Sequence, residues 1–207
     1  MNPLSRLFAT LCLGCLALQA QSPTLFAGWY TGFALGQSSL RIPGRSMEME
    51  GIQYANVNAK GTQAGGKLYL GYWIDPHLGF ETSVASLGKV NADFSYKLPP
   101  AEAGTGTTQI SVSNFTLSLQ AGQRLDKFLL FARGGVQAWR LAYDTRFRLS
   151  TGELQQRELS QSGNSFFWGA GAEWNFKGHW NLRLEGESLK MDITDAKVIS
   201  MGLTYRL

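Results

Sequence analysis

The chain has 207 residues, a formal net charge of +4, and many glycine and aromatic residues. The length suits one domain, and the mild charge argues against nucleic acid, which calls for clustered basic residues. Both cysteines, Cys12 and Cys15, lie near the start, so a chain without that segment has no thiol for disulfides, metal ligation or catalysis. No metal-ligand spacing or phosphate-binding glycine loop is present. We therefore expect no metal and no cofactor.

The first residues form a predicted export signal. A short polar lead with Arg6 precedes a brief apolar run, and Ala20 supplies a small residue at a cleavage point. The run is too short for a membrane-spanning helix, which needs roughly 20 apolar residues. A lipoprotein signal ending at Cys15 is the alternative, although the residue three before it is not aliphatic. We predict a signal peptide at 1–20 and one mature domain at 21–207.

Apolar and polar residues then alternate in short segments, with the period of a β-strand. In the first of these, Trp29, Phe33 and Leu35 share one face, while Tyr30 and the glycines lie on the other. No stretch beyond the signal is apolar enough for a membrane helix. Eight segments alternate in chain order: 29–36, 67–74, 78–85, 115–122, 128–137, 166–176, 180–187 and 199–207. Eight is the smallest strand number typical of outer-membrane barrels.

The connections alternate in length. Short turns are predicted near Pro76, Asp126 and Gly178, and a fairly short one near 194–196. The long, polar connections are 38–58, 98–108 and 145–164. Short periplasmic turns and longer external loops are typical of outer-membrane proteins, and a spanning sheet must close because lipid cannot pair a free edge. We therefore predict an all-β fold, a closed antiparallel eight-stranded transmembrane up-and-down β-barrel.

The two faces of the strands identify the side that contacts lipid. A soluble barrel with apolar residues inside is the alternative, but the polar face carries charges of both signs, which a narrow lumen can hold if they pair. The predicted lumen charges are Lys67, Glu81, Arg133, Glu173, Arg183, Glu185 and Arg206, with Glu187 on the same face. Aromatic residues of the apolar face gather near the short turns, as a girdle at the membrane interface would. The predicted girdle is Trp29, Phe80, Phe128, Trp174, Phe176, Trp180 and Tyr205.

Several short motifs follow one another along the predicted strands. They include Trp29-Tyr30-Thr31-Gly32, Gly79-Phe80-Glu81, Arg133-Gly134-Gly135, Arg183-Leu184-Glu185 and Leu203-Thr204-Tyr205-Arg206. Together they resemble the barrel domain of outer membrane protein A, the OmpA family, over nearly the whole mature chain. The resemblance implies a bacterial outer-membrane location and a lumen closed by a charged gate. Members of the family also carry a separate peptidoglycan-binding domain. No such domain follows the last predicted strand, so we do not expect anchoring to the cell wall.

The resemblance also assigns roles inside the gate. It implies that Glu81 and Arg183 close the pore and that Glu173 can compete as a partner. The family's competing lysine falls at Gln120, so the switching role would pass to Arg133 or to a lysine of the lumen.

Three functional hypotheses follow from the sequence. The first is a structural membrane protein with a plugged or narrowly ion-conducting lumen. The second is a surface adhesin or receptor that binds host or phage ligands through its loops, since the first loop mixes charged residues with Met47 and Met49. The third is a lipid A-modifying enzyme, but His77 and His179 fall in predicted periplasmic turns, away from the outer leaflet. We therefore expect no enzymatic activity.

The expected partners follow from the predicted location. They are outer-membrane lipids and lipopolysaccharide, the barrel-assembly machinery and periplasmic chaperones. The last strand resembles the signal that the assembly machinery reads, although it ends in Leu207 where Phe or Trp is usual. We expect a monomer.

Overall fold

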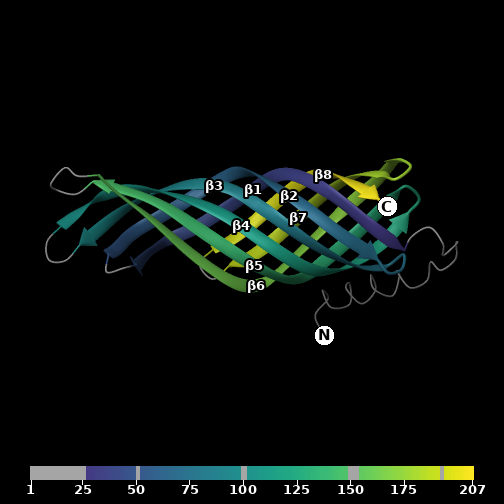
Figure 1. The fold of residues 1–207 in the computed structure, drawn as a ribbon, viewed down its shortest axis with the longest axis horizontal. Helices are drawn as coiled ribbons and strands as arrows, with labels where there is room; N and C mark the ends of the chain where they lie inside the picture. Colours follow the sequence, from purple (N-terminus) through teal and green to yellow (C-terminus); the bar gives the residue numbers. More distant parts are fainter. Residues whose placement is uncertain (1–26, 50–51, 99–101, 149–153, 192–193) are drawn as a thin grey trace, which may run out of the picture.

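Eight antiparallel strands close into a single barrel (Figure 1). The computed structural model describes residues 27–49, 52–98, 102–148, 154–191 and 194–207, so the predicted signal peptide lies outside the described residues. The strands are β1 (Gly28–Met49), β2 (Ile52–Trp73), β3 (Leu78–Leu98), β4 (Glu102–Leu125), β5 (Phe128–Arg148), β6 (Leu154–Lys177), β7 (Trp180–Met191) and β8 (Thr194–Arg206). Each strand pairs with its neighbours in sequence, and β8 returns to β1. The predicted up-and-down barrel is confirmed.

Side chains alternate between lipid and lumen along every strand. In β4 the exposed fraction of Leu119 is 65%, whereas that of the next residue, Gln120, is 1%. The same contrast separates exposed Leu68 from buried Lys67 in β2. The apolar face therefore points outward and the polar face inward, because successive residues of a strand project to opposite sides of the sheet. No helix in the described ranges is long and apolar enough to cross a membrane.

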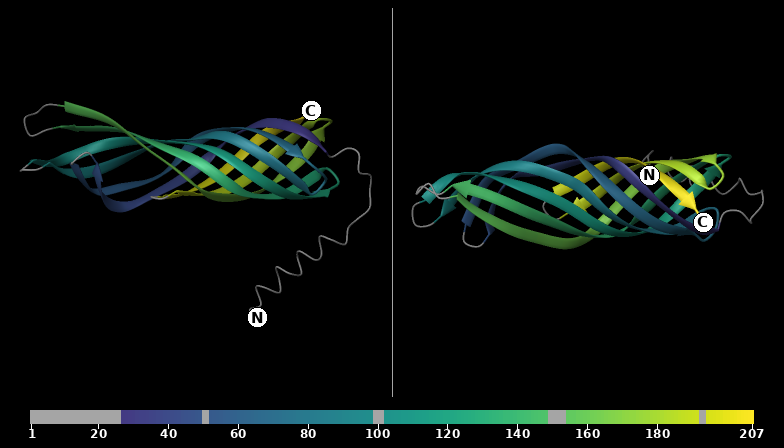
Figure 2. Two further views of the ribbon diagram at one scale, coloured as in Figure 1. Left: turned by 60° about the horizontal axis from the view of Figure 1, so that its bottom comes forward. Right: turned by 45° about the horizontal axis from the view of Figure 1, so that its top comes forward.

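Six strands are much longer than the membrane requires. Strands β1 to β6 have 21 to 24 residues, whereas β7 and β8 have 12 and 13. A tilted strand crosses a bilayer in about 9–11 residues. The long strands run together past the ends of β7 and β8, and form an extension at the end away from the C-terminus (Figures 1 and 2).

This extension corrects the prediction of long loops. Most of residues 38–58, 98–108 and 145–164 continue the strands, and residues 194–196 belong to β8. The prediction was wrong because these segments are polar in sequence, and where their side chains are described, as at Thr107 and Gln156, polar residues lie on the outer face. Outside the membrane that face meets water, so a polar exterior does not end a strand.

Short turns close the other end of the barrel, as predicted. Between β2 and β3 the carboxylate of Asp75 accepts hydrogen bonds from the backbone N–H groups of His77, at 2.7 Å, and Leu78, at 2.8 Å. Asp126 and Gly178 adopt positive φ angles of 53° in the turns that precede β5 and β7. Asparagine, aspartate and glycine tolerate this left-handed conformation best.

A β-bulge in β3 changes the side to which its residues point. Ser86 pairs with Ser113 of β4, but Lys89 pairs with Ser111, so β3 carries one extra residue there. Gly88 sits in this bulge with a φ of 89°. Odd-numbered residues of β3 face inward up to Leu87, whereas beyond the bulge Lys89 faces outward. Bulges re-aim side chains in this way.

Candidate functional site

Four acidic and four basic side chains meet inside the barrel. Lys67 comes from β2, Glu81 from β3, Arg133 from β5, Glu173 from β6, Arg183, Glu185 and Glu187 from β7, and Arg206 from β8. We call this set of eight the lumen network. Its formal charge is zero, and the inward alternation of six strands brings it together inside the barrel. The seven charges predicted for the lumen all point inward, as does Glu187.

Glu81 is the centre of the lumen network, and its side chain is fully buried. Its Oε2 lies 2.6 Å from Nη1 of Arg183, and Nη2 of the same guanidinium lies 3.3 Å from Oε1. Arg133 donates to Oε1 from the other side of the barrel. The Tyr30 hydroxyl donates to Oε2 at 2.9 Å. One carboxylate thus joins β1, β3, β5 and β7.

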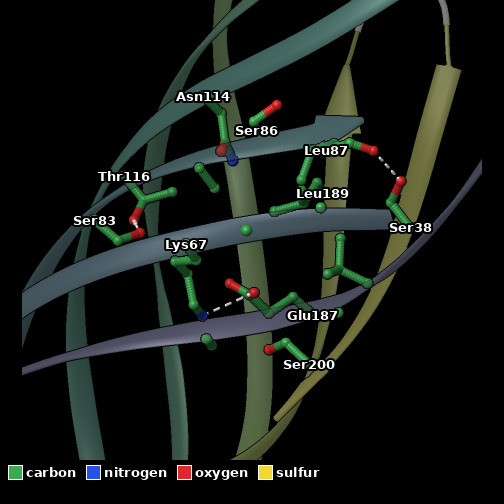
Figure 3. A pocket seen from close by; sticks show the side chains of 16 residues that line it. Ser38, Lys67, Ser83, Ser86, Leu87, Asn114, Thr116, Glu187, Leu189 and Ser200 are labelled. Carbon is green, nitrogen blue, oxygen red and sulfur yellow. Dashed lines mark hydrogen bonds and ion pairs between the residues drawn. The ribbon is translucent and has the colours of Figure 1, made fainter. Parts of the chain in front are cut away.

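A second group of ion pairs lies beside the first. The Nε atom of Arg133 lies 2.5 Å from Glu185, and Arg133 also donates to Glu187. The Lys67 ammonium donates to Glu185 at 2.6 Å. It also donates to Glu187 at 3.0 Å, and Figure 3 shows this contact. Every one of these charges is therefore compensated, as burial requires.

Glu173 lies toward the short-turn end of the lumen network. It is 3.6 Å from Arg183 and 3.3 Å from Arg206, and it accepts a hydrogen bond from Thr204 at 3.3 Å. Arg183 thus lies among three acids, since Glu185 is also 3.1 Å away, and Glu81 is the nearest of them. Gln120, which stands where the OmpA family has its competing lysine, donates instead to the Tyr30 hydroxyl.

Aromatic rings hold the guanidinium groups in place. The centre of the Arg183 guanidinium lies 4.4 Å from the Phe131 ring centroid and 4.6 Å from that of Tyr69. The Arg133 guanidinium lies 5.1 Å from the Phe167 ring. These are cation–π distances. The sequence interpretation did not assign Tyr30 or Tyr69 to the site, although their place on the polar face was a usable signal.

Apolar layers lie on both sides of the lumen network. The layer nearer the short turns is Tyr30, Ala34, Tyr69, Trp73, Leu129 and Phe131. The larger layer, toward the extension, is Leu40, Leu87, Val90, Ala92, Ile110, Val112, Trp139, Leu141, Tyr143, Phe167, Leu189, Met191, Ala196 and Val198. We call this the upper apolar cluster. The sequence interpretation missed it because most of its members lie in stretches that were assigned neither to a strand nor to a loop.

A small cavity separates the lumen network from the upper apolar cluster. Its volume is about 20 Å³, and its wall includes Ser38, Lys67, Thr116 and Ser200 (Figure 3). This volume is on the scale of a single water molecule. Ser38 donates to the backbone carbonyl of Leu87 at 2.5 Å across the top of the cavity. At this level the space between the side chains is therefore small.

The seven aromatic residues of the predicted girdle lie on the outer face near the short turns. Their rings meet across neighbouring strands. The ring centroids of Trp180 and Tyr205 are 4.9 Å apart, and those of Trp29 and Tyr72 are 5.1 Å apart. Phe128 stacks on Trp174 at 6.5 Å.

Both histidines lie in the short turns. Nδ1 of His77 is 3.1 Å from the carbonyl of Gly122, and Nδ1 of His179 is 2.8 Å from that of Arg206. Within the described ranges no group of three or more histidine, cysteine or acidic residues could hold a metal ion.

Residues 8–206 match the family model described as outer membrane protein beta-barrel domain. The chain belongs to this family. It is therefore an integral β-barrel protein of the bacterial outer membrane. No curated protein matches the chain closely enough to be reported as a relative.

Solved structures of small outer-membrane barrels share its fold. Neisserial surface protein A is 11% identical with a TM-score of 0.56, and the match covers 90% of this chain and 100% of that one. OprG from Pseudomonas aeruginosa is 12% identical with a TM-score of 0.54, over 88% of this chain and 97% of that one. Ail, the attachment invasion locus protein of Yersinia pestis, is 14% identical with a TM-score of 0.51, over 87% and 99%.

Proposed function

We propose that this family member is a sealed, structural outer-membrane barrel whose lumen network acts as a closed gate. The observation that carries the proposal is the position of Glu81 on β3, bound at once by Arg133 of β5 and by Arg183 of β7. An ion that crosses this level must displace a fully paired, buried carboxylate. The upper apolar cluster adds a second barrier, because it offers a passing ion few polar partners, among them the Trp139 indole nitrogen and the Tyr143 hydroxyl.

The lumen network also suggests how the gate could open. Arg183 can exchange Glu81, at 2.6 Å, for Glu173, at 3.6 Å, by a small side-chain movement. Arg133 stands where it can keep Glu81 compensated during that exchange. In this proposal Arg133 takes the part that the family lysine would play at Gln120.

The test is the conductance of the refolded mature chain in a planar lipid bilayer. We expect the native chain to be silent or to show rare small steps. Glu81→Ala should show larger or more frequent steps, because the lumen network gains a net positive charge and Arg133 and Arg183 keep only Glu185 as a shared partner. Asp144→Ala is the matched control, since Asp144 forms an exposed ion pair with Arg146 at 3.5 Å in the extension. Correct folding is checked by the altered gel mobility of unboiled samples.

Frequent steps of equal size in all three proteins would contradict the gate. Silence in the native chain and in folded Glu81→Ala would mean that the upper apolar cluster alone seals the barrel. In that case the gating part of the proposal fails and the structural part stands.

A second candidate function is surface attachment, favoured by the extension. The last β1 residue that pairs with β8 is Arg41, and β6 pairs with β7 only from Phe167 onward in the described ranges. Both edges of the extension are therefore open, and open edges can pair with a strand of another protein. A host or phage protein is the proposed partner. Deleting residues 43–58, which shortens the β1–β2 hairpin, should abolish cell or phage binding. Unchanged binding would remove this candidate.

We propose no catalytic activity, because both histidines are held at the periplasmic end by backbone carbonyls. The barrel-assembly machinery and periplasmic chaperones remain the proposed partners during assembly of a monomer.

A further inference from the structure

The residues of the outer wall change from apolar to mostly polar along one row of paired residues. Directly opposed residues on six neighbouring strands form this row: Leu35, Gly66, Ser86, Ser113, Arg140 and Ser162. We call it the boundary row. The adjacent row toward the short turns holds Phe33, Leu68, Val84, Phe115 and Ala138. Beyond the boundary row, toward the extension, the outward residues of β3 to β6 are mostly polar.

Small side chains make the boundary row a groove. Gly66, Ser86 and Ser113 lie beside the large apolar residues of the adjacent row, and together with Phe33 and Phe115 they line a hollow of about 820 Å³. These large residues are about half exposed or more, so they give the hollow an apolar wall on the side toward the short turns. The shape suits hydrocarbon chains that lie against the barrel.

Two cations stand where this groove meets a polar one. Arg140 lines both hollows, and Lys89 lines the second, polar hollow with Gln109 and Ser111. Both cations are exposed, and neither makes a hydrogen bond or ion pair with another described residue. Lys89 reaches the outer wall because the bulge at Gly88 turns it outward. Without the extra residue it would continue the inward set that ends at Leu87.

Two acids also line the polar hollow, but farther from the lipid-facing wall. Asp144 and Glu158 oppose each other two rows beyond Arg140. Asp144 is engaged, since it accepts a hydrogen bond from Gln156 at 3.0 Å and lies 3.5 Å from Arg146. The order from lipid to water is thus apolar groove, cations, acids. A ligand with an apolar body and an anionic headgroup matches the first two of these levels, with its body in the groove and its headgroup on the cations.

We propose that this surface binds one molecule of lipopolysaccharide through its lipid A moiety, with acyl chains in the groove and phosphate on Arg140 and Lys89. The site lies on the extension side of the apolar wall, where the outer leaflet meets the barrel. Six strands spaced about 4.8 Å apart make the boundary row roughly 24 Å long. That length suits a lipid with several acyl chains better than a two-chain phospholipid. The proposal is independent of whether the lumen conducts.

The test titrates the refolded mature chain with purified bisphosphorylated lipid A in detergent micelles, with bound lipid counted by native mass spectrometry. The charge variant is Arg140→Gln with Lys89→Gln. The shape variant is Ser113→Leu, which fills the groove without changing charge. The matched control is Lys190→Gln with Lys197→Gln, two exposed outward cations on β7 and β8. Folding of every variant is checked by the mobility of unboiled samples, and Arg140→Gln alone replaces the double variant if that one does not fold.

We expect the charge variant to bind lipid A at least tenfold more weakly, the shape variant to bind it several-fold more weakly, and the control to match the native chain. Dephosphorylated lipid A should bind the native chain as weakly as lipid A binds the charge variant. Unchanged affinity in the charge variant would overturn the proposal. The proposal would also be overturned if phosphatidylglycerol bound as tightly as lipid A and its binding depended equally on Arg140, because the ligand would then be a phospholipid.

Discussion

Replacing Glu81 by glutamine should destabilise the barrel far more than the similar shapes of the two side chains suggest. Glutamine keeps the volume and can still accept a hydrogen bond from Tyr30, but it removes the negative charge shared by Arg133 and Arg183. The lumen network then carries a net charge of +1 at a level where these side chains are almost completely buried. Removing one partner of a buried ion pair costs about 3–5 kcal/mol. We expect a loss in that range.

The assay is equilibrium unfolding in urea of the chain reconstituted in lipid vesicles, followed by tryptophan fluorescence and by the mobility of unboiled samples. With a slope of about 2 kcal/mol per molar urea, the expected loss moves the midpoint by roughly 1.5–2.5 M. Asp144→Asn is the control, since its ion pair with Arg146 is exposed and such pairs contribute about 0–1 kcal/mol. A loss below about 1 kcal/mol for Glu81→Gln would refute the view that the lumen network depends on complete pairing.

Two further substitutions test the packing of the lumen. Gly135→Ala should destabilise the barrel by about 1–3 kcal/mol, because a Cβ there would lie 2.0 Å from the backbone oxygen of Leu117. Gly134→Ala should be nearly neutral, because a Cβ on the outer face there would lie 3.7 Å from its nearest neighbour. Urea midpoints of the two variants make the comparison, and equal midpoints would contradict it. Trp139→Ala should cost about 3–5 kcal/mol by emptying part of the upper apolar cluster. Its conductance should stay silent, because the lumen network is intact, and open channels would show that the cluster is the main seal.

The number of strands and the direction of their faces could be predicted from the sequence because alternation is local. Within lipid, one face must be apolar, so Leu119 and Gln120 are distinguishable by position alone. The strand ends were not predictable by the same rule. Beyond the membrane the outer face becomes polar while the inner face becomes apolar, so buried Ile110 and Leu141 lie in stretches that were assigned neither to a strand nor to a loop.

The members of the lumen network were predictable, but their pairing was not. Lys67 and Glu185 are 118 residues apart, and their contact exists because ring closure brings β2 and β7 to opposite walls of one narrow lumen. The role of Gln120 likewise depends on Tyr30, which lies 90 residues away. The outward direction of Lys89 could not be predicted, because a strict period of two places this residue inward unless the bulge at Gly88 is known.

The layered lumen explains why charges occupy the middle of this barrel. Buried ion pairs are often no better for stability than apolar side chains of similar volume, so the lumen network is a poor source of net stability. Its value lies in the geometry that it imposes. Glu81 is satisfied only when β3 faces both Arg133 on β5 and Arg183 on β7, and Glu187 is fully paired only when β7 faces both Arg133 and Lys67 on β2. Any slip in strand register would turn one of these charges toward lipid or leave it unpaired. We infer that the lumen network selects the single register in which the barrel closes.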